Sequence, residues 1–349
     1  MRAGLVNFLT QVAIASSLLF IPLFAKELGA SDFEIGMIAS AYSLATFVSS
    51  NIFGRLSDFY DRKKIILLGL LLSAIFFFAQ SFSTSPIHLL AIRALLGFSL
   101  GIFPAALISY AYEKNRNIGY FSSFGSLGWA IGQLLAGMIV IYEGIFTFGA
   151  FLVCLAFLIV LYEKISGNAP LERKGSLSLI KSNFSVYLAF FLRHTGASAV
   201  WLIFPIHLAE IGISRFWIGV IYFTNSFLQF IVMQRIEKYD PRILLNIGTL
   251  LSALAFLLYS IALNVWEFLG IQFIIATAWS AMYVGSLRLL LERNAERNTV
   301  TGFLNSTIHL STILGSIFGG IVAQNFGYKA CFYFGAILSL FAISSRVKN

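Results

Sequence analysis

The chain has 349 residues, of which 58% are hydrophobic and only 11% charged, and its mean hydropathy is +0.85. Soluble domains are about 45–50% apolar, so this composition excludes an ordinary soluble enzyme or binding domain. The formal net charge is +9, and its distribution along the chain decides whether it indicates a nucleic-acid partner or an orientation in a membrane.

The apolar residues form runs of the length that a helix needs to cross a bilayer, about 20 residues for a hydrocarbon core of about 30 Å. The loops between the runs are too short for a soluble domain, so we predict an all-α integral membrane protein with 12 transmembrane helices. The first run could be a signal peptide, but the repeat described below indicates a retained span. The predicted spans are residues 4–25, 34–53, 65–82, 86–111, 118–141, 144–162, 183–208, 216–234, 243–262, 266–290, 299–323 and 328–344.

Lysine and arginine are distributed unequally between the two sides of the predicted membrane. With the amino terminus in the cytoplasm, nineteen of these bases lie on the cytoplasmic side, and only Lys26, Arg215 and Lys329 lie on the other. This is the positive-inside pattern, and an even number of spans then places both termini in the cytoplasm. Because the bases are spread over several loops and both tails, the net charge does not indicate nucleic-acid binding.

The sequence repeats itself at an offset of 183 residues. The segment FIPLFAKELGASDFEIG, residues 20–36, aligns with IFPIHLAEIGISRFWIG, residues 203–219, and three glycines later in the first half align in the same register. We therefore predict a six-helix bundle at 1–162, a cytoplasmic linker at 163–182 and a second six-helix bundle at 183–349. Halves with an even number of spans have the same orientation in the membrane, as in some transporters. The aligned glycine pairs are Gly119 with Gly302, Gly132 with Gly315, and Gly137 with Gly320.

A charged loop, GRLSDFYDRKK at residues 54–64, separates the second and third spans. It resembles the G-x-L-[AS]-D-x-x-[DG]-R-[RK]-[RK] loop of the major facilitator superfamily, and the twelve spans and central basic loop extend this resemblance over the whole chain. The resemblance implies the two-bundle fold of that family and secondary transport by alternating access, with the loop helping to close the cytoplasmic side. By resemblance, the cytoplasmic gate is Gly54, Asp58 and Arg62, with Glu113 as a further member.

Other segments extend the resemblance. IRALLGFSLGIFP, residues 92–104, resembles the family's fourth span, in which a buried arginine precedes glycines, and GSLGWAIGQLLAG, residues 125–137, resembles its glycine-rich fifth span. The fifth span lacks the Gly-Pro pair of the proton-coupled drug antiporters. The matching loop of the second half, RIEKYDPR at 235–242, keeps Tyr, Asp and a base but has lost the leading Gly and the first Asp. For Lys63 and Lys64, enforcement of topology is the better interpretation.

Two arginines are predicted to lie inside the membrane, Arg93 about seven residues into the fourth span and Arg193 about ten residues into the seventh. No Asp or Glu lies at comparable depth, and His194 and His309 are the other titratable groups there. Because polar groups at this depth are costly, we treat them as candidates for a functional site. A buried guanidinium can bind a substrate carboxylate or phosphate. For Arg93 a structural role beside backbone carbonyls is an equal alternative, whereas for Arg193 substrate binding is favoured.

Polar side chains also recur on single helix faces, which predicts a shared polar pathway. In the eleventh span they follow steps of four, three and four residues, and the fifth span carries polar residues at the aligned positions. Each could instead make an interhelical hydrogen bond, worth about 0.6 kcal/mol, and Trp201 could be ordinary packing. The predicted substrate-binding residues are Arg93, Arg193, His194, Asn7, Gln11, Trp201, Asn305, His309, Ser126 and Gln133.

An enzyme is the competing class. GFSLG at residues 97–101 matches the G-x-S-x-G pattern of serine hydrolases, but the nucleophile needs a strand-to-helix turn, and Ser99 is predicted inside an apolar helix. The sequence contains no metal-binding constellation, P-loop or dinucleotide motif. Cys154 and Cys331 fall within predicted spans, which favours packing over a disulfide or metal site.

The sequence therefore predicts a multi-pass cell-membrane transporter for a small amphipathic or anionic solute, with no cofactor and driven by a gradient. Multidrug efflux by proton antiport is the alternative, with His194 or His309 available to carry a proton. The absence of a carboxylate near the midplane weakens proton coupling. We expect the solute and membrane lipid as partners, no nucleic acid, and by resemblance a monomer.

Overall fold

The computed structural model describes residues 2–57, 60–115, 118–163, 177–236, 238–294 and 297–344. Throughout these ranges the regular structure is helical, without a strand. The chain forms two compact units. Unit 1 consists of Met1–Leu171 and Ser214–Ser226, and unit 2 consists of Glu172–Ile213 and Phe227–Asn349.

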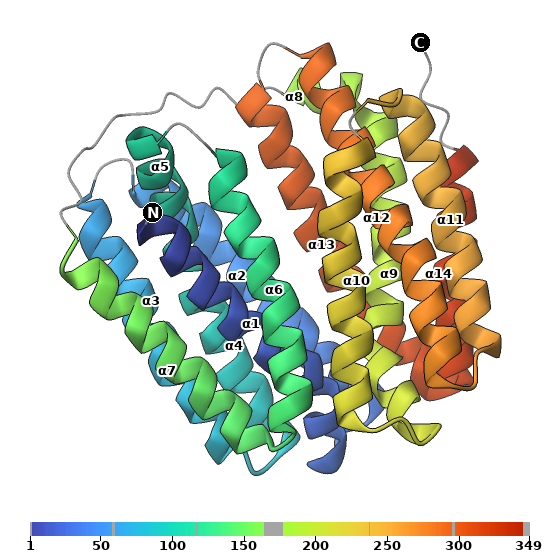
Figure 1. Ribbon diagram of the computed structural model, residues 1–349, viewed down its shortest axis with the longest axis horizontal. Coiled ribbons are helices and arrows are strands. Elements are labelled where there is room, and N and C mark those ends of the chain that lie inside the picture. Colours follow the sequence, from blue (N-terminus) through green and yellow to red (C-terminus); the bar gives the residue numbers. More distant parts are fainter. Residues whose placement is uncertain are drawn as a thin grey trace. The chain divides into compact units, whose positions relative to one another are not determined.

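Unit 1 contains the helices of the first half of the sequence (Figure 1). Within it α1 packs against α6 and α7, α2 against α4, and α3 against α4 and α7. Its elements are α1 (Arg2–Glu27), α2 (Asp32–Leu56), α3 (Arg62–Ala79), the short 3₁₀ helix η1 (Gln80–Phe82), α4 (Pro86–Ile102), α5 (Pro104–Asn115), α6 (Ile118–Ile139) and α7 (Tyr142–Leu161).

Unit 2 repeats this arrangement. Here α9 packs against α13 and α14, and α11 packs against α12 and α14. Its elements are α8 (Leu177–Ser182), α9 (Phe184–Glu210), α11 (Pro241–Ile261), α12 (Val265–Arg293), α13 (Arg297–Phe326) and α14 (Tyr328–Ser344). Helix α10 (Arg215–Ile236) is continuous but divided, because its residues up to Ser226 belong to unit 1 and the rest to unit 2. The predicted bundle boundaries, which place all of α10 in the second half, stay a prediction.

All twelve predicted spans overlap helices, and ten of the described helices are long and apolar enough to cross a membrane. The fifth and twelfth predicted spans correspond to shorter apolar helices at Phe124–Ile139 and Tyr328–Ala342. The total of twelve crossings and the cytoplasmic termini therefore remain predictions. The fourth predicted span is represented among the ten by Pro86–Ile108, which contains a local break at Phe103. Helix α4 ends at Ile102 and α5 begins at Pro104, which has no N–H to continue the hydrogen bonds of α4.

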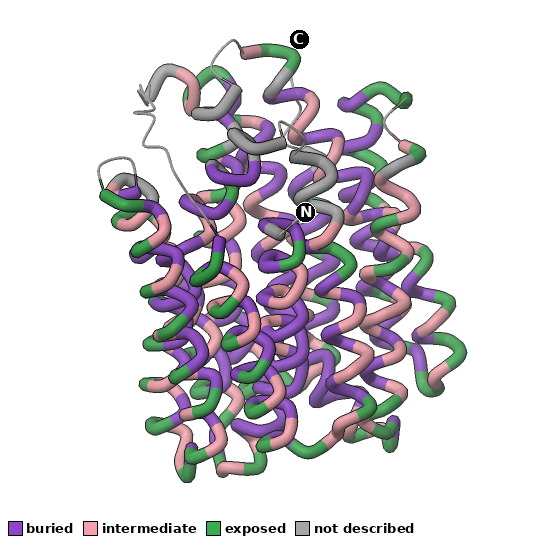
Figure 2. The backbone as a smooth tube through the Cα atoms, turned by 60° about the vertical axis from the view of Figure 1, so that its left-hand side comes forward, coloured by how far each residue is buried: buried purple, intermediate pink, exposed green. Residues whose placement is uncertain are grey.

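Buried and exposed residues alternate along the helices, as expected where one face of a helix packs against its neighbours (Figure 2). Large apolar side chains are also exposed in stripes with helical spacing, at residues 71, 75 and 78 on α3 and at 250, 254 and 257 on α11. Contiguous exposed apolar surface of this kind is suited to contact with lipid.

The ends of α1 and α9 have the same structure, which extends the sequence repeat to the backbone. Gly29 and Gly212, related by the offset of 183, both have positive φ, +90° and +84°. Each donates from its N–H to the carbonyl three residues earlier, and the next N–H reaches back to Ala25 or Leu208. Only glycine adopts this left-handed conformation without a steric cost, so both helices end at the same aligned position.

Glycines bring two pairs of helices to close contact at aligned positions. A Cβ atom on Gly132 of α6 would lie 2.5 Å from the carbonyl oxygen of Val12 on α1. A Cβ on Gly315 of α13 would lie 2.3 Å from the carbonyl oxygen of Thr195 on α9. Both glycines and both carbonyls are related by the offset of 183, so the two halves share the same close crossing at a small residue.

We expect Gly315→Ala to lower the thermal stability of the detergent-purified protein, because the new methyl group must displace α13 from α9. Overpacking of this kind costs about 1–3 kcal/mol. The measurement is the apparent melting temperature. The matched control is Gly270→Ala on α12, where nothing lies within 4 Å of the added carbon. Equal melting temperatures for the two variants would contradict this account of the crossing.

Candidate functional site

Arg193 is the centre of a buried cluster in unit 2. It lies near the middle of α9, is 1% exposed, and its Nε donates to the hydroxyl of Ser252 on α11 at 2.8 Å. Its guanidinium carbon lies 5.4 Å from the ring centre of Trp279 and 5.8 Å from that of Phe256. No carboxylate forms an ion pair with it in the part of the chain that the structure describes. The positive charge is thus stabilised by a hydroxyl and two aromatic rings.

His194 extends the cluster toward α13. Its ring lies 5.2 Å from Trp279 and 5.7 Å from Phe190, and its Nε2 is 3.5 Å from the hydroxyl of Thr312. Its Nδ1 is buried and has no hydrogen-bond partner among the described residues. Trp279 stacks on Tyr283 at 5.6 Å. The predicted pair Arg193 and His194 is therefore brought together with aromatic rings from α9, α11 and α12.

The other residues predicted in the second half are Trp201, Asn305 and His309. Trp201 packs edge-on against Phe204 and Tyr259, at 5.4 and 6.4 Å, as in ordinary aromatic packing. His309 is half-buried on α13, and Asn305, one turn earlier, is exposed. The binding roles predicted for Trp201, Asn305 and His309 remain predictions.

In unit 1 the predicted polar residues lie along the contact between α1 and α6. Gln11 accepts a hydrogen bond from the indole of Trp129 at 2.7 Å, and Gln133 accepts one from the hydroxyl of Ser226 on α10, also at 2.7 Å. Asn7 is buried and its amide nitrogen lies 3.0 Å from the position of a Cβ on Gly125, whereas Ser126 is exposed. These residues form a polar seam, defined here as Asn7, Gln11, Ser126, Trp129 and Gln133.

Arg93 occupies a separate position in unit 1. It is 2% exposed, donates to the side-chain oxygen of Gln80 at 3.2 Å, and lies 4.1 Å above the ring of Tyr42. Gln80 also accepts a hydrogen bond from Ser17 on α1. The structural alternative for Arg93 is therefore supported, but with a glutamine and a tyrosine in place of backbone carbonyls near the glycines.

The predicted cytoplasmic gate is described only in part. Asp58 lies outside the described residues, as does the side chain of Glu113, while Gly54 falls in the last turns of α2. Arg62 begins α3 and is 2% exposed. Asp61 caps α3 by accepting hydrogen bonds from the N–H groups of residues 63 and 64. The second acid of the motif thus has a local structural role.

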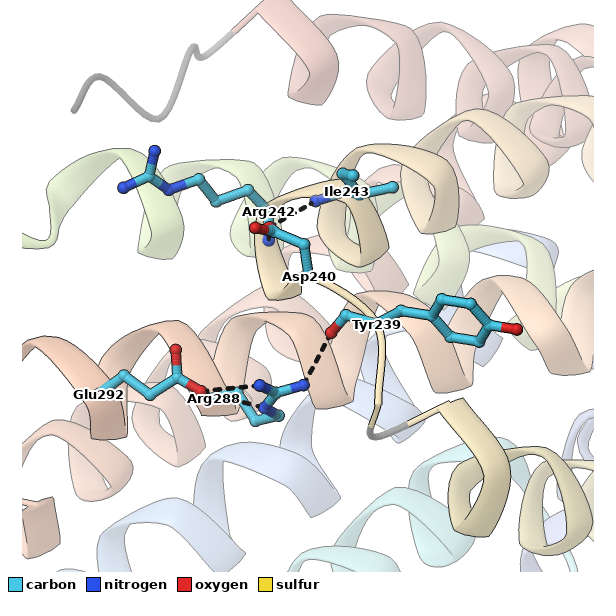
Figure 3. A network of polar contacts seen from close by, with 6 residues as sticks. All are labelled: Tyr239, Asp240, Arg242, Ile243, Arg288 and Glu292. Carbon is cyan, nitrogen blue, oxygen red and sulfur yellow. Dashed lines mark hydrogen bonds and ion pairs between the residues drawn. The ribbon is translucent and has the colours of Figure 1, made fainter.

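Lys63 does more than carry a topological charge, because its ammonium donates to the carbonyl of Leu161 at 2.8 Å, at the carboxyl end of α7. The corresponding loop in unit 2 has a related design (Figure 3). Asp240 caps α11 by accepting from the N–H groups of residues 242 and 243. Arg288 on α12 donates to the carbonyl of Tyr239 at 2.8 Å and pairs with Glu292 at 2.9 Å. The second loop therefore retains its helix cap and is held by a base from another helix.

Ser99 does not have the geometry of a hydrolase nucleophile. It lies within α4, is 0% exposed, and its hydroxyl donates to the carbonyls of Leu95 and Leu96 at 2.7 and 3.0 Å. A nucleophile elbow requires a strand-to-helix turn that exposes the hydroxyl. The GFSLG pattern is thus part of a transmembrane helix whose glycines contact α2.

Sequence reasoning missed several residues that contact the two arginines. These are Ser252 and Phe256 at Arg193, and Tyr42 and Gln80 at Arg93. One signal was present: Asn246, Thr249 and Ser252 recur every three residues in an otherwise apolar run. The aromatic partners gave no signal, because the chain contains 36 Phe and 14 Tyr and the sequence does not distinguish those that lie beside an arginine.

The fold and these buried polar clusters define a class of protein: a multi-pass helical membrane protein with an internal repeat, which is a transporter architecture. A family model described as Major Facilitator Superfamily matches residues 3–184 and 186–346. The chain belongs to the major facilitator superfamily and is a membrane transporter of small molecules.

Curated relatives and solved structures agree with this assignment. The chain is 25% identical over 368 residues to multidrug resistance protein MdtG of Proteus mirabilis (strain HI4320), covering 96% of this chain and 91% of the relative. It is 25% identical over 343 residues to quinolone resistance protein NorA of Staphylococcus aureus (strain COL), covering 90% and 86%. The crystal structure of nucleoside transporter NupG has a TM-score of 0.81 at 13% identity and covers 100% of this chain and 99% of NupG. At that identity the likeness shows the fold alone.

We expect Ser252→Ala to destabilise the protein more than Ser260→Ala on the same helix. Both serines are buried and both donate to a carbonyl of α11, but only Ser252 also accepts from Arg193. Its loss leaves a buried donor unsatisfied, which costs about 1–3 kcal/mol. Thermal unfolding of the two variants makes the comparison, and an equal loss of stability would show that the Arg193 contact contributes little.

Proposed function

We propose that this transporter moves amphipathic aromatic compounds, organic anions among them, across the cell membrane by alternating access. The observation that carries the proposal is the buried guanidinium of Arg193, held by Ser252 and two aromatic rings without a described carboxylate. Such a cluster has aromatic surface for a ring system and a positive charge for an anionic group.

The energetic argument rests on burial. A charged group that is removed from water without an ionic partner costs several kcal/mol, and cation–π contacts offset roughly 2 kcal/mol of this at a desolvated site. An anionic substrate group that approaches the cluster would supply the missing charge. A lipophilic cation would instead be repelled, so the cluster favours neutral and anionic solutes over cationic ones.

Multidrug efflux by proton antiport is the second candidate function. It is supported by the two relatives, which cover 96% and 90% of this chain and are named a multidrug and a quinolone resistance protein. Export is the direction by which a membrane transporter confers resistance. His194 and His309 are then the candidates for the proton, since they are the titratable groups of unit 2 that lie with Arg193 at membrane depth.

The two candidates are distinguished by ligand-dependent thermal unfolding of the purified protein. The ligands share one ring system and differ in charge: a naphthalene carboxylate, the corresponding carboxamide and a naphthylmethyl ammonium. A ligand at 100 times its Kd adds about 2.7 kcal/mol of stability. We expect the carboxylate to stabilise the wild type most, and Arg193→Gln to lose that stabilisation.

The matched control is Arg293→Gln, which removes an exposed arginine at the end of α12 and should keep the response to the carboxylate. Stabilisation by the ammonium compound that persists in Arg193→Gln would discard the anionic proposal and support multidrug efflux. A wild type that responds to none of the three compounds would contradict the aromatic substrate class.

The cytoplasmic gate stays a proposal, supported by the loop resemblance and by the burial of Arg62. We expect Asp58→Asn to favour the inward-open state. The readout is maleimide labelling of Asn305→Cys, an exposed position on α13, in inside-out vesicles after Cys154 and Cys331 are replaced by Ser. Labelling should accelerate in Asp58→Asn and not in Lys64→Gln, which removes an exposed base of the same loop. Unchanged labelling in Asp58→Asn would refute the gate.

Three finer properties belong to the proposal. The protein acts as a transporter without enzymatic chemistry, which the helical setting and internal hydrogen bonds of Ser99 support. It works as a monomer, which the family resemblance supports, and it contacts membrane lipid, which the exposed apolar stripes on α3 and α11 support. A proton is the candidate coupling ion.

A further inference from the structure

We propose that Arg215 is a reversible latch that holds the first half of α10 within unit 1 and controls the opening of the non-cytoplasmic face. The inference rests on the alternating-access function. The latch consists of Arg215, Glu27, Tyr142 and Val140, all of which belong to unit 1. Under the predicted orientation these residues lie at the non-cytoplasmic ends of α1, α6, α7 and α10.

Arg215 is held by several contacts at once. Its Nη2 donates to the carboxylate of Glu27 at the end of α1 and to the hydroxyl of Tyr142 at 2.7 Å. The Tyr142 hydroxyl in turn donates to the same carboxylate at 2.6 Å, which closes a triangle of three side chains. The guanidinium carbon lies 4.3 Å above the Tyr142 ring. One arginine thus ties the start of α10 to α1 and α7.

The fourth contact reaches a strained turn. Arg215 Nη1 donates to the carbonyl of Val140 at 2.9 Å. Val140 joins α6 to α7 with φ of +65°, and it is the one non-glycine residue with positive φ in the described part of the chain. The N–H of Ile141 bonds back to the carbonyl of Ile139 at 2.7 Å, which is the rare, strained kind of γ-turn. A β-branched residue strongly disfavours this conformation, so neighbouring contacts must maintain it.

The helix behind the latch is packed closely against α6. A Cβ on Gly219 of α10 would lie 2.7 Å from the Cα of Gly137. About two helical turns further along α10, the hydroxyl of Ser226 donates to Gln133. These contacts have no bulky interlocking side chain between Gly137 and Gly219. Separation at this crossing therefore loses little interdigitation, and the polar latch adds a directional restraint at the start of α10.

The exposure of the latch suits a reversible contact. The Glu27 side chain is 54% exposed and that of Arg215 is 28% exposed, so water can replace the ionic partners when the contact opens. Strain in the Val140 turn favours release of Arg215 from this turn, and the contacts of Arg215 oppose that release. The latch also explains a sequence anomaly, because Arg215 is one of only three bases on the side that the positive-inside pattern leaves depleted.

The test measures access to α10 directly. In a chain with Cys154 and Cys331 replaced by Ser, Ser226→Cys reports whether α10 is seated against Gln133. A membrane-impermeant maleimide is applied to intact cells and to inside-out vesicles, so the result does not depend on the predicted orientation. We expect Arg215→Gln to accelerate labelling from the non-cytoplasmic side about fivefold or more.

Three comparisons make the result specific. Lys329→Gln removes an exposed base on the same predicted side and should leave labelling unchanged. Glu27→Gln should also accelerate labelling. The double variant Glu27→Gln with Arg215→Gln should be labelled about as fast as Arg215→Gln alone, because both substitutions remove the same contact. Val140→Gly should slow labelling, since glycine adopts the turn without strain.

Labelling of Arg215→Gln at the wild-type rate, or equal acceleration by Lys329→Gln, would overturn the latch. Additive effects in the double variant would overturn the Glu27 pairing, and unchanged or faster labelling of Val140→Gly would overturn the role of strain. If Arg215→Gln does not fold, Glu27→Gln and Tyr142→Phe test the same contacts. Failure of the latch with a retained ligand response would leave the proposed function intact, because the thermal assay does not depend on α10 access.

Discussion

The close crossing of α6 over α1, repeated by α13 over α9, is the constraint on which the rest of each unit depends. At both crossings a glycine faces the backbone carbonyl of the central helix, and an added carbon would lie within 2.5 or 2.3 Å of that oxygen. Lipid gives helices no hydrophobic reason to associate, so their association depends on dispersion and weak polar contacts. Close approach gains these contacts, and a larger spacing would lose them. The polar seam of unit 1 and the Arg193 cluster of unit 2 both lie along α1 or α9, whose positions these crossings determine.

The two buried arginines show how a membrane helix can hold a charge without a carboxylate. Arg93 uses an amide and a tyrosine ring, and Arg193 uses a hydroxyl and two aromatic rings. Neutral partners leave the net charge uncompensated, which is unfavourable for stability but keeps the guanidinium able to attract an anion. Arg93 shares its glutamine with α1, which is a structural arrangement. Arg193 lies beside His194 and Trp279, and the Nδ1 of that histidine has no hydrogen-bond partner among the described residues.

The sequence was sufficient for the helices, the repeat and the family, because each depends on patterns within the chain: apolar run length, a constant offset and a loop motif. It also aligned Gly132 with Gly315, which the structure places at equivalent crossings. It could not give the rotation of each helix about its axis, which decides that Trp201 packs on Phe204 while Trp279 covers Arg193. For the same reason Ser252 was missed. The break at Phe103 was missed because the apolar run continues through Pro104, and hydropathy does not register a missing N–H.

The repeat is kept at the helix crossings and at the ends of α1 and α9, but it is lost around Arg215. At the offset of 183, the counterpart of Tyr142 is Asn325, that of Val140 is Ala323, and that of Arg215 is Asp32. The triangle around Arg215 is not reproduced, because Asn325 lacks the ring and hydroxyl of Tyr142 and Asp32 has the opposite charge to Arg215. Packing requires both halves to keep the same crossings, whereas a transporter that opens one face at a time needs different contacts in its two halves at the faces that move. Divergence around Arg215, with preserved crossings, is the pattern expected of a duplicated bundle whose two halves make different contacts at a face that opens.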